Sequence, residues 1–211
     1  MSHPPAVSLG AAARKVELRR LVLARRDGLG PVRRAELSAR IFARVLDLEA
    51  FRTARTVLAY HSFGSEPVTA PLLREVLRRG QVLGLPRVNR QARALDLYRV
   101  RDPDRDLVAG VWGIREPDPA RCPPLAVEAP DFVLVPGVAF DARGGRIGYG
   151  AGYYDRLLGR CSAGAALVAA AFEVQLVDEV PWEPHDRRVD RVVTERCIHP
   201  EEPRARQGAE G

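Results

Sequence analysis

Apolar residues near the N-terminus recur at near-helical spacing and predict two consecutive helices. The first helix is expected from about residue 11 to residue 26, and Gly28 is its predicted stop. Its apolar positions are Val16, Leu18, Leu21, Val22 and Leu23. The second helix is expected over about 32–48, with one apolar stripe that consists of Leu37, Ile41, Val45 and Leu48.

The pattern then changes from a helical period to a strand-like one. Residues 56–60 form a short β-rich run, a helix is expected over about 70–79, and residues 82–85 form a short strand before Pro86. A strand, a helix and a second strand in this order indicate a right-handed crossover between two parallel strands.

Four more strands and one more helix are expected in the rest of the chain. The strands cover 94–100, 131–135, 166–172 and 189–193, and the helix covers about 152–158. Residues 101–130 are rich in Pro, Asp and Arg and are expected to form a long loop around Trp112, and such loops are usually functional. We therefore predict one α/β domain over residues 1–211, with a mostly parallel sheet and flexible tails at about 1–9 and 203–211.

Composition narrows the class of protein. Hydrophobic residues make up 46% of the 211 residues, which is ordinary for a protein with a buried core. Arginines interrupt every apolar stretch before it reaches the roughly 20 residues that span a bilayer, and residues 1–9 lack a secretory signal pattern. The three cysteines, Cys122, Cys161 and Cys197, are odd in number and far apart. These features predict a cytoplasmic protein without a membrane partner or a disulfide framework.

Charge suggests an anionic ligand without identifying it. The net charge is +6, which suits either a nucleic acid or a small polyanion such as a nucleotide. The positive residues are interleaved with acids, however, so most of them are expected on the solvated surface. Lys15 is the only lysine among 33 basic residues. Either it survives by chance, or its position requires a compact ammonium that a planar guanidinium cannot replace.

The densest candidate site is a glycine-rich segment between the strand at 131–135 and the helix at 152–158. Five glycines fall within nine residues: Gly144, Gly145, Gly148, Gly150 and Gly152. Glycines let backbone amides approach an anion closely, and a helix N-terminus adds partial positive charge. Arg146 and Arg156 flank the segment, and Asp155 could hold a metal that bridges phosphates. Phosphate binding is one interpretation, and a merely flexible turn is the other.

Two common nucleotide motifs are excluded. A Walker A loop requires Gly-Lys-Ser/Thr, but the only lysine lies between Arg14 and Val16. The dinucleotide fingerprint requires Gly-x-Gly-x-x-Gly, and here Tyr153 occupies the place of its last glycine. The glycine-rich segment must therefore belong to another class of loop.

The combined motifs resemble the 5-formyltetrahydrofolate cyclo-ligase family over most of the chain. The resemblance is carried by the segments 136–141, 146–150 and 152–155, together with Lys-Val-Glu-Leu-Arg at 15–19. Shorter matches are Leu-Pro-Arg at 85–87, Trp-Gly-Ile at 112–114, Ala-Phe-Glu at 171–173, His185-Asp186 and Val189-Asp190. The resemblance implies a three-layer α/β/α sandwich, Rossmann-like, and an enzyme that uses ATP to cyclise 5-formyltetrahydrofolate to 5,10-methenyltetrahydrofolate.

The resemblance also implies roles for individual residues. The implied ATP-binding residues are Lys15, Val16, Glu17, Leu18, Arg19, Arg146, Ile147, Gly148, Tyr149, Gly150, Ala151, Gly152, Tyr153 and Tyr154. Among these, Lys15 and Arg146 are the expected catalytic residues. The expected folate contacts are His61, Glu66, Trp112, Tyr149 and Tyr153, and a tryptophan in a long loop can stack on a pterin ring.

Magnesium is the implied cofactor, with Asp155 and Asp190 as its ligands. Because parallel strands can bring their ends to one edge of a sheet, we expect the two aspartates to meet. The alternative is that Asp155 only caps a helix and that Asp190 is a solvated surface acid.

Two departures from the family pattern and two rival functions stay open. Gln81 stands where relatives commonly have lysine, and Ala151 should be tolerated if its φ angle is negative.

One rival function is that of another ATP-dependent small-molecule enzyme on the same fold. The other is a nucleic-acid-binding relative, which we do not expect because no aromatic and basic run resembles an RNA-recognition motif. The expected assembly is a monomer or a weak homo-oligomer.

Overall fold

The computed structural model describes residues 10–183 and 186–200, and its centre is an eight-stranded sheet. The strand order is β12-β11-β10-β7-β1-β2-β3-β6. The strands are β1 (Thr56–Leu58), β2 (Val82–Asn89), β3 (Ala94–Val100), β6 (Pro124–Leu125), β7 (Phe132–Leu134), β10 (Ala166–Ala170), β11 (Arg191–Val193) and β12 (Ile198–His199). The run from β11 to β2 is parallel, whereas β12, β3 and β6 are antiparallel to their neighbours.

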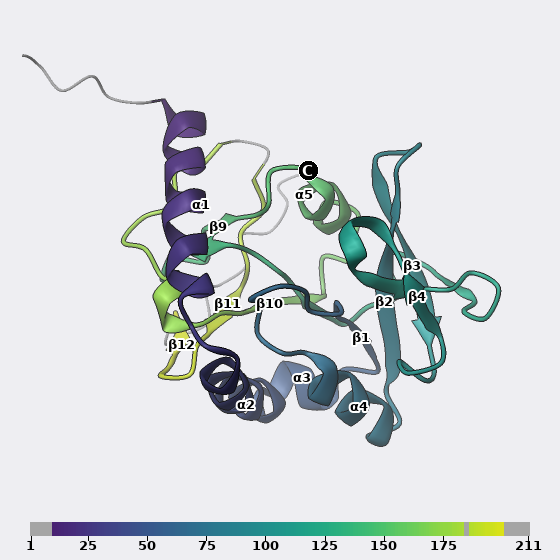
Figure 1. Cartoon of the computed structure of the whole chain (residues 1–211). Coiled ribbons are helices and arrows are strands. Elements are labelled where there is room, and N and C mark those ends of the chain that lie inside the picture. Colours follow the sequence, from purple (N-terminus) through teal and green to yellow (C-terminus); the bar gives the residue numbers. More distant parts are fainter. Residues whose placement is uncertain (1–9, 184–185, 201–211) are drawn as a thin grey trace, which may run out of the picture.

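Helices cover both faces of this sheet (Figure 1). They are α1 (Ala11–Asp27), α2 (Pro31–Asp47), α3 (Glu49–Thr53), α4 (Ala70–Arg78) and α5 (Tyr153–Leu158). One buried cluster joins α2, α3 and α4 to one face, with Phe51 edge-on against Phe132 at 5.2 Å between ring centroids. A second cluster joins α5 to the opposite face through Leu157 and Leu158. The α/β class with a mostly parallel sheet is therefore confirmed, and the helix arrangement matches the expected three layers.

The predicted β-α-β crossover is present as β1, α4 and β2. Thr56 to Leu58 pair in parallel with Val82 to Gly84. β2 does not end before Pro86, as the sequence suggested, but continues to Asn89. The pairing with β1 ends near Gly84, so Pro86 lies beyond it and its missing N–H removes no bond to β1.

Two segments that were expected to be loops contain additional strands. Within 101–130, β4 (Leu107–Ala109) pairs with β5 (Arg115–Pro117), and the 3-10 turn η1 (Val111–Gly113) connects them. Within the glycine-rich segment, β8 (Ala139–Phe140) pairs with β9 (Arg146–Ile147). Both hairpins are too short to show a clear alternation of apolar and polar residues, which is why the sequence pattern missed them.

Only some of the apolar residues of helix α1 are buried. Val22 is fully buried in a third small cluster with residues of β8, β9 and the segment near Val180, and Leu18 and Leu23 pack against it. Val16 and Leu21 are exposed, whereas Lys15 and Arg26 are buried. The buried side of α1 thus carries charged residues, and the fold turns these charges toward the glycine-rich segment.

Some expectations lie outside this description. The predicted tails at 1–9 and 203–211 and the motif residue His185 fall outside the described residues. Among the residues that are described, no helix combines the length and the apolar character needed to cross a membrane.

Candidate active site

A cavity of about 830 Å³ opens at the edge of the sheet where β1 and β7 end. Tyr60 and Pro136, which follow these two strands, both line it. Of the predicted site residues, these contribute to its wall: Lys15, Val16, Arg19, His61, Glu66, Trp112, Arg146, Ile147, Gly148, Tyr149, Gly150, Ala151, Gly152, Tyr153, Tyr154 and Asp155. The carboxyl edge of parallel strands is the usual ligand position in such sheets.

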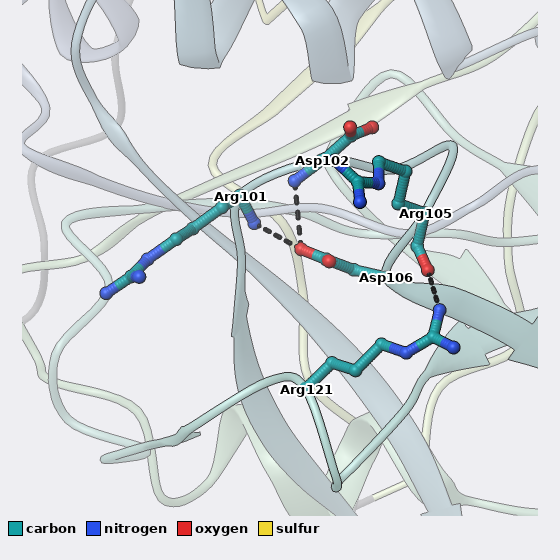
Figure 2. Close-up of a pocket in the computed structure, with 5 residues that line it drawn as sticks. All are labelled: Arg101, Asp102, Arg105, Asp106 and Arg121. Carbon is teal, nitrogen blue, oxygen red and sulfur yellow. Dashed lines mark hydrogen bonds between the residues drawn. The ribbon is translucent and has the colours of Figure 1, made fainter.

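A second cavity, of about 530 Å³, lies between the loops at 101–106 and Arg121 and has a different character. The Asp106 carboxylate accepts the backbone N–H groups of Arg101 and Asp102, both at 2.9 Å, and Arg121 donates to the carbonyl of Arg105. Figure 2 shows these bonds, and it shows the Arg101 guanidinium pointing away from the other four residues. No predicted site residue lines this cavity, so we take the larger cavity as the candidate site.

The glycine-rich segment forms one wall of the site and is held by α1. Arg19 on α1 donates from its Nε to the carbonyl oxygen of Gly148 at 2.8 Å. Gly150 follows with φ of 102°, which disfavours any residue with a side chain. A Cβ atom at Gly150 would lie at ordinary van der Waals distance from the Arg19 guanidinium, 3.7 Å, so the φ angle and not crowding sets the requirement for glycine. The segment therefore presents its backbone to the cavity in a conformation that requires glycine.

Arg146 and Asp155 form a partly buried ion pair on this wall. Arg146 Nη2 lies 2.5 Å from Asp155 Oδ1, and Arg146 Nη1 donates to the carbonyl of Pro136 at 3.3 Å. The Arg146 residue is only 6% exposed, and its Nε has no hydrogen-bond partner among the described residues. A buried donor without a partner is costly, so this nitrogen is a candidate contact for an anionic ligand.

Lys15 lies on the same side of the cavity and is paired with two acids. Its Nζ is 2.6 Å from Glu183 Oε2 and 2.5 Å from Asp186 Oδ2, and the residue is 9% exposed. Burial alone would lower the pKa of the ammonium group, but the hydrogen bonds and charges of Asp186 and Glu183 outweigh this effect and raise its pKa. Lys15 is therefore cationic near neutral pH.

Glu66 lies in the opposite part of the cavity and contacts the glycine-rich segment. Its Oε1 accepts the Tyr149 hydroxyl at 2.8 Å, and its Oε2 accepts the backbone N–H of Phe63 at 3.1 Å. Burial raises the pKa of this carboxyl group, although the hydrogen bonds from Tyr149 and Phe63 and the charge of Arg26 act in the opposite direction. A buried acid in a cavity, with a raised pKa and specific partners, is typical of functional positions.

Aromatic residues and His61 complete the wall. Trp112 is 65% exposed at the rim, with its ring centroid 6.3 Å from that of Tyr153. Its backbone has φ of 58°, an unfavourable conformation for a residue with a bulky side chain. Burial lowers the pKa of the His61 imidazole, which therefore favours the neutral form near neutral pH. This part of the cavity can accept a flat ring.

Asp190 is not brought to the cavity, so the expected meeting with Asp155 is wrong. Its Oδ2 accepts the backbone N–H of Leu167 at 2.8 Å, near the start of β10. Asp190 itself immediately precedes β11, which runs parallel to β10. Parallel strands begin at one edge of the sheet and end at the other, so Asp190 lies at the edge opposite the cavity.

Two of the residues expected to bind ATP also lie outside the cavity wall. Glu17 is exposed on α1, and Leu18 packs into the third apolar cluster. The spacing of helical residues explains both positions, because only every third or fourth residue of α1 faces the cavity.

Sequence reasoning missed Arg26 and assigned no role to the acids that pair with Lys15. Lys15, Arg19, Val22 and Arg26 are separated by four, three and four positions, which places them on one helical face. This spacing was a usable signal for Arg26. Glu183 and Asp186 are remote in sequence from Lys15 and carry no local signal of their pairing.

The two departures from the family pattern have local explanations. Gln81 donates from its Nε2 to the carbonyls of Phe51 and Ala54, at 2.9 and 2.7 Å, and so ties the end of α3 to β2 away from the cavity. Ala151 lines the cavity and is not among the residues with positive φ, so its methyl group is accommodated as expected.

Comparisons with known proteins agree on one group of relatives. A model of the 5-formyltetrahydrofolate cyclo-ligase family matches residues 11–195. The 5-formyltetrahydrofolate cyclo-ligase of Mycolicibacterium smegmatis is 38% identical over 148 residues, which cover 67% of this chain and 74% of the relative. The Escherichia coli enzyme of the same name is 30% identical over 175 residues, 82% of this chain and 96% of the relative. The NMR structure of Aquifex aeolicus 5,10-methenyltetrahydrofolate synthetase superposes with a TM-score of 0.78 at 35% identity, over 93% of this chain and 97% of that one.

Proposed function

Because the chain belongs to the 5-formyltetrahydrofolate cyclo-ligase family, we propose that it converts 5-formyltetrahydrofolate to 5,10-methenyltetrahydrofolate, with ATP going to ADP and phosphate. The observation that carries this proposal is a single cavity with two different sides. One side has three cationic residues, Lys15, Arg19 and Arg146, next to a glycine-rich backbone, and the other side is apolar and aromatic. Such a cavity suits a triphosphate beside a pterin ring.

On the first side, the glycine-rich segment and the cationic residues bind the ATP phosphates. Arg146 Nε, which has no protein partner among the described residues, donates to a phosphoryl oxygen. Lys15 offers a compact positive charge, and Arg19 holds the segment in place through the Gly148 carbonyl. Phosphoryl transfer depends mainly on positioning and charge neutralisation, which this set of groups supplies.

On the second side, the ring of 5-formyltetrahydrofolate lies against apolar residues of β2 and β3 and under Trp112. Leu85, Pro86 and Leu95 supply the apolar surface. Glu66 and His61 line the same cavity and orient the ring by hydrogen bonds. The positive net charge of the chain also favours capture of two anionic substrates.

The chemistry follows from the poor leaving ability of the formyl oxygen. Transfer of the γ-phosphoryl group to that oxygen releases ADP and makes an iminium phosphate. Attack by N10 of the folate on the formyl carbon then closes the ring as phosphate and the N10 proton depart. Arg146 and Lys15 stabilise the charge that moves onto the phosphoryl oxygens.

Magnesium fits this site as an ion that enters with ATP. Asp155 lines the cavity beside Arg146, and among the described residues no cluster of three or more His, Cys, Asp or Glu side chains could hold a metal by itself. Magnesium commonly takes one or two carboxylates and completes its shell with phosphates and water, so Asp155 is a sufficient protein ligand. When bound, the ion neutralises phosphate charge.

The test of the proposed function is direct. Purified protein is mixed with Mg-ATP and 5-formyltetrahydrofolate, and formation of the methenyl product is followed by absorbance together with ADP release. We expect both products in a one-to-one ratio and no reaction without ATP. ADP release that does not depend on the folate would instead favour another ATP-dependent enzyme on the same fold.

The two aspartates are expected to differ in their contribution to turnover. Asp155→Asn should lower kcat on the order of 10²-fold and raise the magnesium concentration needed for half-maximal activity, because it removes the proposed carboxylate ligand of magnesium. Asp190→Asn is the matched control, since an amide oxygen can still accept the Leu167 N–H at the far edge of the sheet. A magnesium titration of both variants checks this. An equal rise in the magnesium concentration at half-maximal activity in both variants would indicate that Asp190 is also a magnesium ligand.

We also propose that the protein is cytoplasmic and that it is a monomer or a weak homo-oligomer. Size-exclusion chromatography with light scattering tests the oligomeric state. Titration with generic RNA at physiological salt tests the expectation that nucleic acid is not a partner.

A further inference from the structure

Arg26 is a buried cation behind the cavity rather than in its wall. It lies in the last turn of α1 and is 2% exposed. None of the described carboxylates is within ion-pair distance of its guanidinium, and its Nη1 is buried without a hydrogen-bond partner among the described residues. A charge this deeply buried is costly unless its contacts compensate, so the two hydrogen bonds that it makes, in addition to a cation–π contact with the Tyr149 ring at 5.8 Å, require an explanation.

These two contacts lead to both sides of the active site. Arg26 Nε donates to Ser65 Oγ at 2.8 Å, and Nη2 donates to the Tyr149 hydroxyl oxygen at 2.9 Å. Ser65 is the immediate neighbour of Glu66, and Tyr149 belongs to the glycine-rich segment. Arg26 thus holds the loop after β1 and the glycine-rich segment at the same time.

The contact with Tyr149 also determines a proton position. A guanidinium can only donate, so the Tyr149 oxygen accepts from Arg26 and its own proton must point elsewhere. That proton is directed to Glu66 Oε1, at 2.8 Å. The relay of Arg26, Tyr149 and Glu66 therefore leaves the glutamate as an acceptor with a fixed orientation.

We propose that Arg26 is a positioning residue that couples the glycine-rich segment to Glu66. It thereby fixes the position of the ATP subsite relative to the folate subsite. This inference rests on the proposed function for the identity of the substrates. Arg26 touches neither substrate, and it acts through Tyr149 and Ser65.

Removal of the cation should also change the titration of Glu66. Tyr149, Tyr60 and Tyr154 are the titratable groups near it, and burial raises the pKa of each phenol, so all three stay neutral at physiological pH. Arg26 is thus the charged group that faces Glu66 and lowers the pKa of its carboxyl group. Without this cation the carboxyl group retains its proton to a higher pH.

The experiment compares Arg26→Gln with Arg25→Gln, an identical change at the exposed neighbouring residue of the same helix. We expect Arg26→Gln to raise KM for the folate by about 10- to 100-fold, with a smaller effect on the KM for ATP, because a charge-assisted hydrogen bond is lost. In the free protein, NMR titration of the Glu66 carboxyl group should show a higher pKa. Arg26→Lys should restore the Glu66 pKa but not the full folate affinity, since one ammonium cannot replace the guanidinium fork.

Tyr149→Phe tests the relay at its middle member. It also gives a test that does not depend on the folding of the Arg26 variants. It keeps the ring but removes the hydroxyl, so in this background Arg26→Gln should raise the folate KM by less than it does in the wild type, because only the bond from Arg26 to Ser65 is left to lose. The proposal is overturned if Arg26→Gln and Arg25→Gln share the same Glu66 pKa and folate KM. If the wild type does not turn over the folate, the proposed function fails, whereas the NMR titration still decides whether Arg26 controls Glu66.

Discussion

Replacement of Arg146 with glutamine should lower kcat by about 10² to 10³-fold, the typical effect of removing one donor that stabilises charge in a transition state. Arg146 lies in the cavity wall with its Nη2 on Asp155 and a buried Nε that has no partner among the described residues. Glutamine cannot supply the same fork of donors to a phosphoryl group. Single-turnover measurements with saturating ATP would separate the chemical step from binding.

The control for this variant is Arg143→Gln. Arg143 precedes the same strand, but its guanidinium is exposed and pairs with Glu179. Exposed pairs contribute little, so turnover should stay at the wild-type level. Equal kcat values for the Arg143 and Arg146 variants would show that Arg146 has no role in phosphoryl transfer.

Lys15→Ala should raise the KM for ATP by more than about 30-fold, an effect that corresponds to the loss of one partner from a partly buried charge pair. Two causes add up at this position. The variant removes a cation from the phosphate side of the cavity, and it leaves Glu183 and Asp186 without the ammonium between them. The negative charges of these two carboxylates, no longer offset by the ammonium, would then repel the incoming triphosphate.

A second variant separates these causes. We add Glu183→Gln and Asp186→Asn to the Lys15→Ala variant. These two changes remove the repulsion and should recover part of the ATP affinity. The part of the affinity that comes from attraction between the ammonium and the phosphates should stay lost. Lys15→Arg should not rescue fully, because a planar guanidinium cannot take the place of a compact ammonium between two acids. Calorimetric titration with ATP provides the measurement, and Arg14→Ala at the exposed adjacent position is the control. If the two acid substitutions restored the full ATP affinity, the only role of Lys15 would be to neutralise Glu183 and Asp186.

Local patterns predicted most of the elements but not how they pack. The helix at 11–26 and the strand at 94–100 agree with α1 and β3 within one residue at each end, because periodicity is a strong signal over such lengths. The apolar pattern of α1 did not show which of its sides is buried: Val16 and Leu21 are exposed, whereas Lys15 and Arg26 are buried. Charges enter a buried face only when remote partners compensate them, and those partners are not adjacent in sequence.

The candidate site was predictable where its residues are contiguous. The segment from Arg146 to Asp155 lines the cavity as a continuous wall, so a motif in the sequence corresponds to a surface in space. Asp190 illustrates the limit of this reasoning. Whether an acid near a strand lies at the beginning or at the end of that strand decides which edge of the sheet it occupies, and β11 starts one residue later than Asp190. The strand expected at 189–193 already placed Asp190 near its beginning, so the error was to group the beginning of one strand with the glycine-rich segment, which follows the end of another.

The third apolar cluster has a consequence for how the site opens. It joins α1 to the hairpin of β8 and β9 through five buried residues, Val22, Val138, Ala139, Ile147 and Val180, and it is separate from the clusters on the two faces of the sheet. Segments with few buried apolar contacts undergo local unfolding at a lower free energy than the global transition. A ligand that contacts both α1 and the hairpin binds only their docked form, so its binding free energy adds to the cost of that local opening. The phosphate side of the cavity is therefore the part of the molecule whose amide hydrogen exchange a nucleotide should slow most.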